Sequence, residues 1–204
     1  MKTSYSITIE RSGAEAGDFY INGASCPEEE EEKLGYSSIS LLPQQLYGVI
    51  AGTGSEEVSS GRALLSSFSS PALFSESEAF LKALQETEAA VSGLSILKNR
   101  LLVFQSGNGG LYRIRQQAIV DLLSDQAENA GVCFGVISED GSLPGDLYII
   151  CSSGVSEILG SDRILRICQE TDRIQEIASA LLKASRESGN REAASSVIAV
   201  RRDA

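Results

Sequence analysis

The spacing of apolar residues separates expected strands from expected helices in this chain. Alternating apolar and polar positions predict a strand over residues 5–9 and a short second strand over 18–21. Two apolar runs within 94–107 flank Lys98 and Asn99, as in a hairpin. Other short apolar runs predict strands at 45–55, 109–115, 118–124, 132–138, 146–152 and 195–202. The run at 146–152 is followed by Ser152, Ser153 and Gly154, which predict a tight turn.

Helical spacing occurs in four places. Ser75 and Glu78 form a capping-box pattern at the start of the second of these helices. The expected apolar faces contain Gly61, Leu64, Leu65 and Phe68 in the first helix, and Phe80, Leu81, Leu84 and Val91 in the second. A short helix is expected at 161–168, and a strongly amphipathic helix at 174–185 is expected to stop at Gly189.

This order of elements predicts an α+β fold. The helices come in one pair near the first third of the chain and one pair near its end, and strands fill the middle and both termini. Because apolar helix faces must be covered, we expect two antiparallel sheets with helices outside them. No repeat or linker divides the sequence, so residues 1–204 are interpreted as a single compact domain.

Composition and charge exclude several classes of protein. The 204 residues are 42% hydrophobic and 22% charged, values typical of soluble globular proteins. No apolar run approaches the roughly 20 residues that cross a bilayer, and the first residues do not resemble a secretion signal, so a cytoplasmic location is expected. The net charge of −11 argues against nucleic-acid binding. The consecutive glutamates at 28–32 are interpreted as a solvated loop.

The sequence contains no histidine, and this restricts its chemistry. Nucleophile systems that depend on histidine and zinc sites with imidazole ligands are both excluded. A metal would need carboxylate ligands. The four cysteines, none of them in a CxxC pair, are expected to be small core residues in a reducing compartment: Cys26, Cys133, Cys151 and Cys168.

Four strings combine an apolar strand with a polar or glycine-rich turn: YGVIAGTGS, RLLVFQSGNGGLYRIR, LPGDLYIICSSGV and ALLKASRESGNREAASSVIAVRR. In this order they resemble the PPM or PP2C family of metal-dependent protein serine/threonine phosphatases. The third string is the clearest, because Gly145 and Asp146 match the family's turn and the apolar residues after them match its strand. The resemblance implies a four-layer α-β-β-α sandwich of two antiparallel sheets flanked by helices, and the compact length is typical of bacterial members.

In that family two Mn²⁺ or Mg²⁺ ions, held by carboxylates at strand ends, activate the water that attacks the phosphate. Most of these carboxylates are absent here. The family's ligand motifs fall on Ala51 and Gly52, Asn108 and Gly110, Ser153 and Gly154, and Ala193. Asp18 is the only plausible remnant, next to Gly17 at the position of the family's glutamate. The phosphate-holding arginine falls near Gly13, where Arg11 could replace it only if the loop shifts.

Other readings of these positions stay open. Acidic residues lie close to the vacant places in the sequence: Glu56, Glu57, Glu157, Asp162 and Glu192. A register shift would be needed to use them, and a shift of one residue turns a strand side chain to the opposite face. Asp18 can also be a plain polar residue at a strand start, and Ser153 and Gly154 a turn kept for its backbone shape. The SGNGG string is interpreted as a hairpin turn, and Gly52–Ser55 as at most a weak anion site.

We therefore expect a pseudophosphatase, a catalytically deficient PP2C-like domain without bound cofactor that acts in signalling by binding a protein such as a kinase or a phosphoprotein. Family analogy alone supplies these partners. The alternative is an active Mn²⁺- or Mg²⁺-dependent protein phosphatase with substituted ligands. A third reading is an interaction module with a similar sandwich reached by convergence.

Overall fold

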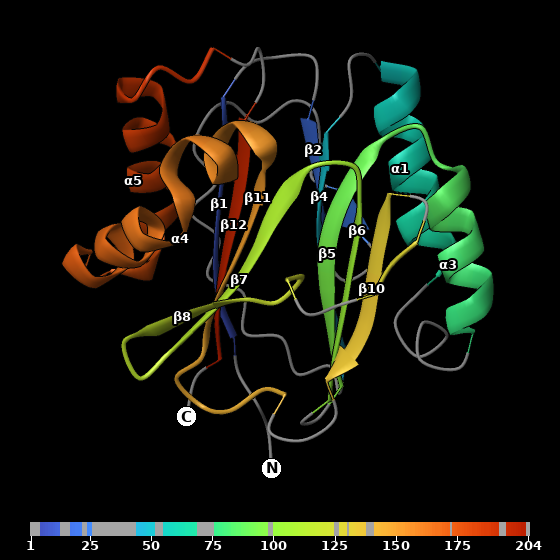
Figure 1. The fold of residues 1–204 in the computed structure, drawn as a ribbon, viewed down its shortest axis with the longest axis horizontal. Helices are drawn as coiled ribbons and strands as arrows, with labels where there is room; N and C mark the ends of the chain where they lie inside the picture. Colours follow the sequence, from blue (N-terminus) through green and yellow to red (C-terminus); the bar gives the residue numbers. More distant parts are fainter. Residues whose placement is uncertain are drawn as a thin grey trace.

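The computed structural model describes twelve ranges of the chain: 5–12, 17–21, 24–25, 44–51, 55–68, 76–97, 100–124, 127–129, 131–137, 141–171, 173–191 and 195–202. Figure 1 shows two sheets face to face in the middle, with helices on both outer sides. Cys26, the glutamates at 28–32, Gly13, Gly52, Glu192 and Ala193 lie outside the described residues.

Every strand pairing in these ranges is antiparallel. The five-stranded sheet has the order β1 (Tyr5–Ser12), β12 (Ser195–Arg202), β11 (Leu147–Ser152), β7 (Gly109–Arg115) and β8 (Ala118–Asp121). The seven-stranded sheet has the order β3 (Ala24–Ser25), β2 (Gly17–Ile21), β4 (Gln44–Ala51), β5 (Ala90–Leu97), β6 (Arg100–Ser106), β10 (Val132–Ile137) and β9 (Ala127–Asn129).

Each sheet carries a pair of helices on its outer face (Figure 1). Helices α4 (Ser153–Glu170) and α5 (Ile174–Glu187) cover the five-stranded sheet. Helices α1 (Ser55–Ser67) and α3 (Ser77–Glu86) cover the seven-stranded sheet. Within the described ranges, no helix combines the length and hydrophobicity that a membrane span requires.

Three apolar clusters hold the layers together, because alternate residues of each strand face opposite sides. The central cluster lies between the sheets and includes Tyr47, Leu94, Tyr148 and Ile198. The other two lie between each sheet and its helices. The four-layer sandwich of two antiparallel sheets flanked by helices, expected from the sequence, is therefore confirmed.

The second expected helix was wrong at both ends. Helix α3 begins at Ser77, with Glu76 at the N-cap and no side-chain capping bond, so the helix does not begin with a box headed by Ser75. It ends at Glu86, and the extended backbone at Thr87 leads into β5, which contains Val91. Val91 is fully buried in the cluster beneath α1 and α3. The helical spacing of Val91 was misleading, because helix α3 and strand β5 both place apolar residues on this core.

Helix α4 is longer than the sequence indicates. The turn expected at Ser152–Gly154 is absent, because β11 ends at Ser152 and α4 begins at Ser153. The expected helix at 161–168 is only the second part of α4, which has a non-helical backbone at Gly160 (φ 66°, ψ 166°). Serine and glycine in the first turn disguise the helix start, since their propensities favour turns.

The hairpin expected at SGNGG was also wrong. Strand β6 belongs to the seven-stranded sheet and β7 to the five-stranded sheet, so Gly107 and Asn108 carry the chain from one sheet to the other. The other expected hairpin does form, because β5 and β6 are paired up to Leu97 and Arg100, and residues 98 and 99 between them lie outside the described residues.

Candidate functional site

Several predicted ligand positions meet at one end of the two sheets. Ala51 ends β4, and Ser152, next to Ser153 and Gly154, ends β11. Two residues, Gly107 and Asn108, join the ends of β6 and β7, so this end of one sheet lies against the same end of the other. We call this the site end and define it by Ala51, Ser106, Gly109 and Ser152.

Asp18 and Ala51 occupy different register positions. Asp18 pairs with Ile50, and Gly17 pairs with Ala51. Residues directly opposite one another in an antiparallel pair share a face of the sheet. Ile50 packs in the cluster beneath α1 and α3, whereas Val49, on the same face as Ala51, packs between the sheets. The inner position beside Ala51 is thus held by a glycine.

The buried polar side chains at the site end are neutral. Among the described residues they include Ser92, Gln105, Ser106, Ser152, Ser195 and Ser196, each less than 10% exposed. The backbone N–H of Ser196 donates to Ser152 Oγ over 3.1 Å, which ties β12 to β11. Hydroxyls and amides of this kind satisfy one another without supplying the negative charge that a pair of divalent ions requires.

The two sheets touch at Gly109. A Cβ atom added there would lie 2.3 Å from Ser92 Oγ and 3.3 Å from Gln105 Nε2, both on the facing sheet. Neighbouring Gly107 has φ +71°, and an added Cβ would lie 3.0 Å from the Cβ of Ala90. Glycine is therefore required at Gly109 for close approach, and the space between the sheets is filled at this point.

The acidic residues near these positions that the structure describes lie on helices α1 and α4. Glu56 and Glu57 lie in the first turn of α1, where Glu56 is exposed and Glu57 is half-buried. Glu157 and Asp162 lie exposed on α4. Among the described residues, no three metal-ligating side chains form a group. The described residues therefore do not supply the carboxylates of the two-ion centre that the family resemblance implies, and Asn108 is exposed on the loop between the sheets.

Cys151 lies one residue from the end of β11, but it is not prepared for nucleophilic chemistry. Burial raises the pKa of its thiol to about 12. It packs beneath α4, where an added Cβ at Gly110 would approach its sulfur to 3.0 Å. Cys168 in the same cluster also has its pKa raised by burial to about 12. Both thiols stay protonated at neutral pH, as expected for core residues.

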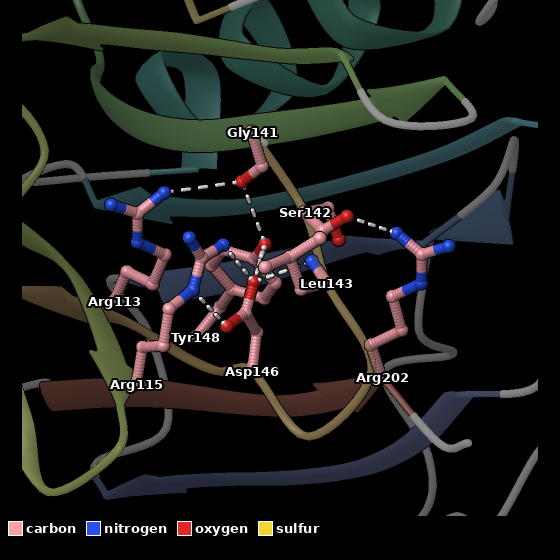
Figure 2. A network of polar contacts seen from close by, with 8 residues as sticks. All are labelled: Arg113, Arg115, Gly141, Ser142, Leu143, Asp146, Tyr148 and Arg202. Atoms are coloured by element: carbon pink, nitrogen blue, oxygen red, sulfur yellow. Dashed lines mark hydrogen bonds and ion pairs between the residues drawn. The ribbon is translucent and has the colours of Figure 1, made fainter. Parts of the chain in front are cut away.

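A charged network occupies the opposite end of the five-stranded sheet (Figure 2). Arg115 donates two hydrogen bonds of 2.7 Å to Asp146, from Nε to Oδ1 and from Nη2 to Oδ2. Leu143 N and the Tyr148 hydroxyl donate to Oδ2 over 2.7 and 3.1 Å. Burial alone would raise the pKa of Asp146, but the hydrogen bond from Arg115, with the others, holds this pKa below its ordinary value.

Two further arginines donate hydrogen bonds to backbone carbonyls in the segment that precedes Asp146. Arg113 Nη1 donates to Gly141 O over 3.3 Å, and Arg202 Nη1 donates to Ser142 O. The sequence identified Asp146 only as a turn residue. The available signal was the spacing of two arginines in one strand. Arg113 and Arg115 stand two residues apart, and that spacing places both on one face of the sheet. Their partners lie about thirty residues away, at separations of 28 and 31, which no local pattern reveals.

Comparisons with solved structures decide the fold. The phosphatase PstP of Mycobacterium tuberculosis matches with a TM-score of 0.65 and 14% identity, covering 100% of each chain. The PstP catalytic domain in complex with two manganese ions matches at 0.67 and 14%, covering 100% of this chain and 99% of that one. The chain has the PP2C phosphatase fold. The phosphatase domain of SpoIIE from Bacillus subtilis also matches, at 0.65 and 16%, covering 100% of this chain and 95% of that domain.

No family model matches the sequence, and no curated protein matches it either. The likeness to PP2C structures is one of fold, at 14–16% identity. A fold of this kind does not by itself carry a function. The residues at the site end must therefore decide what this PP2C-fold chain can do.

Proposed function

We propose that this chain is a pseudophosphatase, a PP2C-fold domain that lacks phosphatase activity and works by binding a protein partner. The neutrality of the site end carries the proposal. The family resemblance assigns three carboxylate positions to Ala51, Asn108 and Ser153, and the buried polar side chains at the site end include serines and the amide of Gln105. Removing the carboxylates removes the ions and the activated water together.

Charge compensation supports this reading. Two divalent cations bring four positive charges, and hard ions of this type are held by several oxygen ligands, among them anionic carboxylates. Asp18 alone cannot balance that charge, and its register position pairs with Ile50 rather than with Ala51. The close contact at Gly109 adds a steric argument, because the facing sheets leave no space there.

The second candidate is an active metal-dependent phosphatase with substituted ligands. One observation favours it: Glu56 and Glu57 lie in the first turn of α1, soon after the end of β4. The PstP domain that shares the fold was solved with two manganese ions. A movement of the α1 start toward Ala51 would bring these carboxylates closer to the site end.

Calorimetric titration with Mn²⁺, together with hydrolysis of p-nitrophenyl phosphate, separates the two candidates. We expect no Mn²⁺ binding at millimolar concentration and no turnover above the buffer. Metal-dependent turnover that disappears in Asp18→Ala or in the Glu56→Gln, Glu57→Gln double variant would establish the second candidate instead. The variant Glu170→Gln, exposed at the end of α4, is the matched control for loss of an acidic side chain.

A gain-of-ligand variant tests the same reasoning from the other side. Ala51→Asp, Ser153→Asp and Ala193→Asp together restore three carboxylates at the positions that the family resemblance assigns. If missing charge is the cause, this triple variant binds Mn²⁺ more tightly than the parent chain. A parent chain that binds Mn²⁺ as tightly as the triple variant would contradict the proposal.

The partner is proposed to be a protein, such as a kinase or a phosphoprotein, in a bacterial cytoplasm. Two proteins with this fold have regulatory roles: PppA is a key regulatory component of the type VI secretion system in Pseudomonas aeruginosa, and SpoIIE is a cell fate determinant. Capture by the immobilised chain from candidate host lysates, repeated with excess Mn²⁺, tests this point. Recovery of a kinase or its substrate is expected, and Mn²⁺ should leave the recovery unchanged.

A further inference from the structure

Asn190 joins three elements at the site end. Its Nδ2 donates to Ser185 Oγ over 2.9 Å and to Ser195 Oγ over 2.8 Å. Ser185 Oγ in turn donates to Gly154 O over 2.6 Å. These contacts connect the end of α5, the beginning of β12 and the first turn of α4. We call this set of Asn190, Ser185, Ser195 and Gly154 the Asn190 clasp.

The backbone at the end of α5 places Asn190 in this position. Gly189 has φ +98°, and its N–H donates to Arg186 O while Asn190 N donates to Ser185 O. These two bonds form a Schellman motif, in which a left-handed glycine turns the chain back over the last helical turn. The glycine that stops the helix therefore also returns the Asn190 side chain to Ser185.

The partners of Asn190 are inaccessible to water. Ser185 is 0% exposed, Ser195 is 1% exposed and Gly154 is buried. The Ser185 hydroxyl donates its one hydrogen to Gly154 O and accepts from Asn190 Nδ2, so this hydroxyl takes part in two hydrogen bonds. No member of the clasp ionises, and its strength is therefore independent of pH over the ordinary range and of divalent ions.

We propose that the Asn190 clasp, rather than a pair of bound ions, fixes the geometry of the site end. The inference rests on the proposed function, since an ion-bearing site would be held by charge. The clasp connects the start of α4, where the family resemblance places a metal ligand at Ser153, with β12, which follows the position of Ala193. The site end consequently presents one fixed surface to a partner, with or without metal.

Hydrogen–deuterium exchange of the full chain tests the clasp. In Asn190→Ala, amides of 153–156 and 195–197 should exchange about tenfold faster or more, because two buried hydroxyls lose a donor. Amides around Asp146, at the opposite end of the sheet, should be unchanged. Asn190→Asp is a milder variant, which can accept from Ser195 but cannot donate to Ser185, and it should accelerate exchange at the same amides by a smaller factor even if the alanine variant does not fold.

The control is Asn108→Ala, an exposed asparagine on the loop between the sheets. If both Asn190 variants exchange no faster than this control, the clasp is refuted and the proposed function is untouched. Exchange measured in 1 mM Mn²⁺ and in EDTA separates the two ideas, and equal rates are expected. Slower exchange of the site end in Mn²⁺ would refute both the clasp and the absence of an ion centre.

Discussion

Replacing Asp146 by asparagine should destabilise the fold strongly. The Asp146 side chain is 1% exposed, and its partner Arg115 is 26% exposed. Breaking a fully buried ion pair costs about 3–5 kcal/mol, and the partial exposure of Arg115 lowers this figure, because water can reach the guanidinium. We therefore expect Asp146→Asn to lower the free energy of unfolding by about 2–3 kcal/mol, less than for a fully buried pair. For a chain of this size that corresponds to a fall in Tm of roughly 4–12 °C.

The geometry explains why asparagine is a poor replacement. Its amide oxygen, placed where Oδ2 lies, can still accept from Leu143 N, the Tyr148 hydroxyl and Arg115 Nη2, but its Nδ2 then faces the Nε donor of Arg115. Urea unfolding at pH 7, with Asp162→Asn as the exposed control, measures the difference. Equal stability of Asp146→Asn and the parent chain would refute the assignment of this network as a main tie between β7 and β11.

The pH dependence gives a second check on the same pair. The pKa of Asp146 is lowered from its ordinary value of 3.8, so the contribution of the Asp146 carboxylate to folding stability is complete above pH 3.8. The contribution is lost as the pH falls from 3.8 through the lower pKa of the folded state. The stability gap between the parent chain and Asp146→Asn should thus be constant from pH 5 to 7 and should shrink below pH 4. A gap that does not shrink in acid would show that the charge of Asp146 is not its source.

One further substitution and one chemical modification test the core. Gly109→Ala should cost about 1–3 kcal/mol in urea unfolding, because the new methyl meets Ser92 Oγ at 2.3 Å, and adding Ser92→Gly should recover part of the loss. If Gly109→Ala is neutral alone, the sheets do not touch there. Cys151 and Cys168, whose pKa values are raised by burial to about 12, should resist iodoacetamide at pH 8 until urea unfolds the chain, as followed by mass spectrometry. Rapid labelling of Cys151 in the native protein would contradict its burial.

Periodicity was a reliable guide where one element faces one core. The apolar stripe of α5 faces a single cluster, and this helix was found close to the expected residues. Strand β12 was also found at the expected residues, as an apolar run whose two faces pack on two different clusters. Periodicity failed at Val91, where an apolar residue of the next strand continued the helical spacing by chance. It failed at Ser153 and Gly154 for another reason, since the preceding strand extends directly into a helix whose first residues are poor helix formers.

The arrangement of the site could be predicted only in part. The family resemblance gave the positions of Ala51, Asn108 and Ser153, and the structure places these at one end of the sheets. The pairing of Asp18 with Ile50 was beyond local patterns, because register depends on the whole strand pair. The contact of Gly109 with Ser92 and the bonds of Asn190 likewise join segments that only the folded chain brings together.

The link between β6 and β7 is short. Three Cα steps separate Ser106 from Gly109, and an extended chain covers at most about 10–11 Å in that length. Packed sheets stand about 10 Å apart, so a tether of this length keeps the two sheets together at this end. The sandwich can therefore widen only away from this tether, and a molecule that forces the layers apart must enter from the side where the chain is not tied.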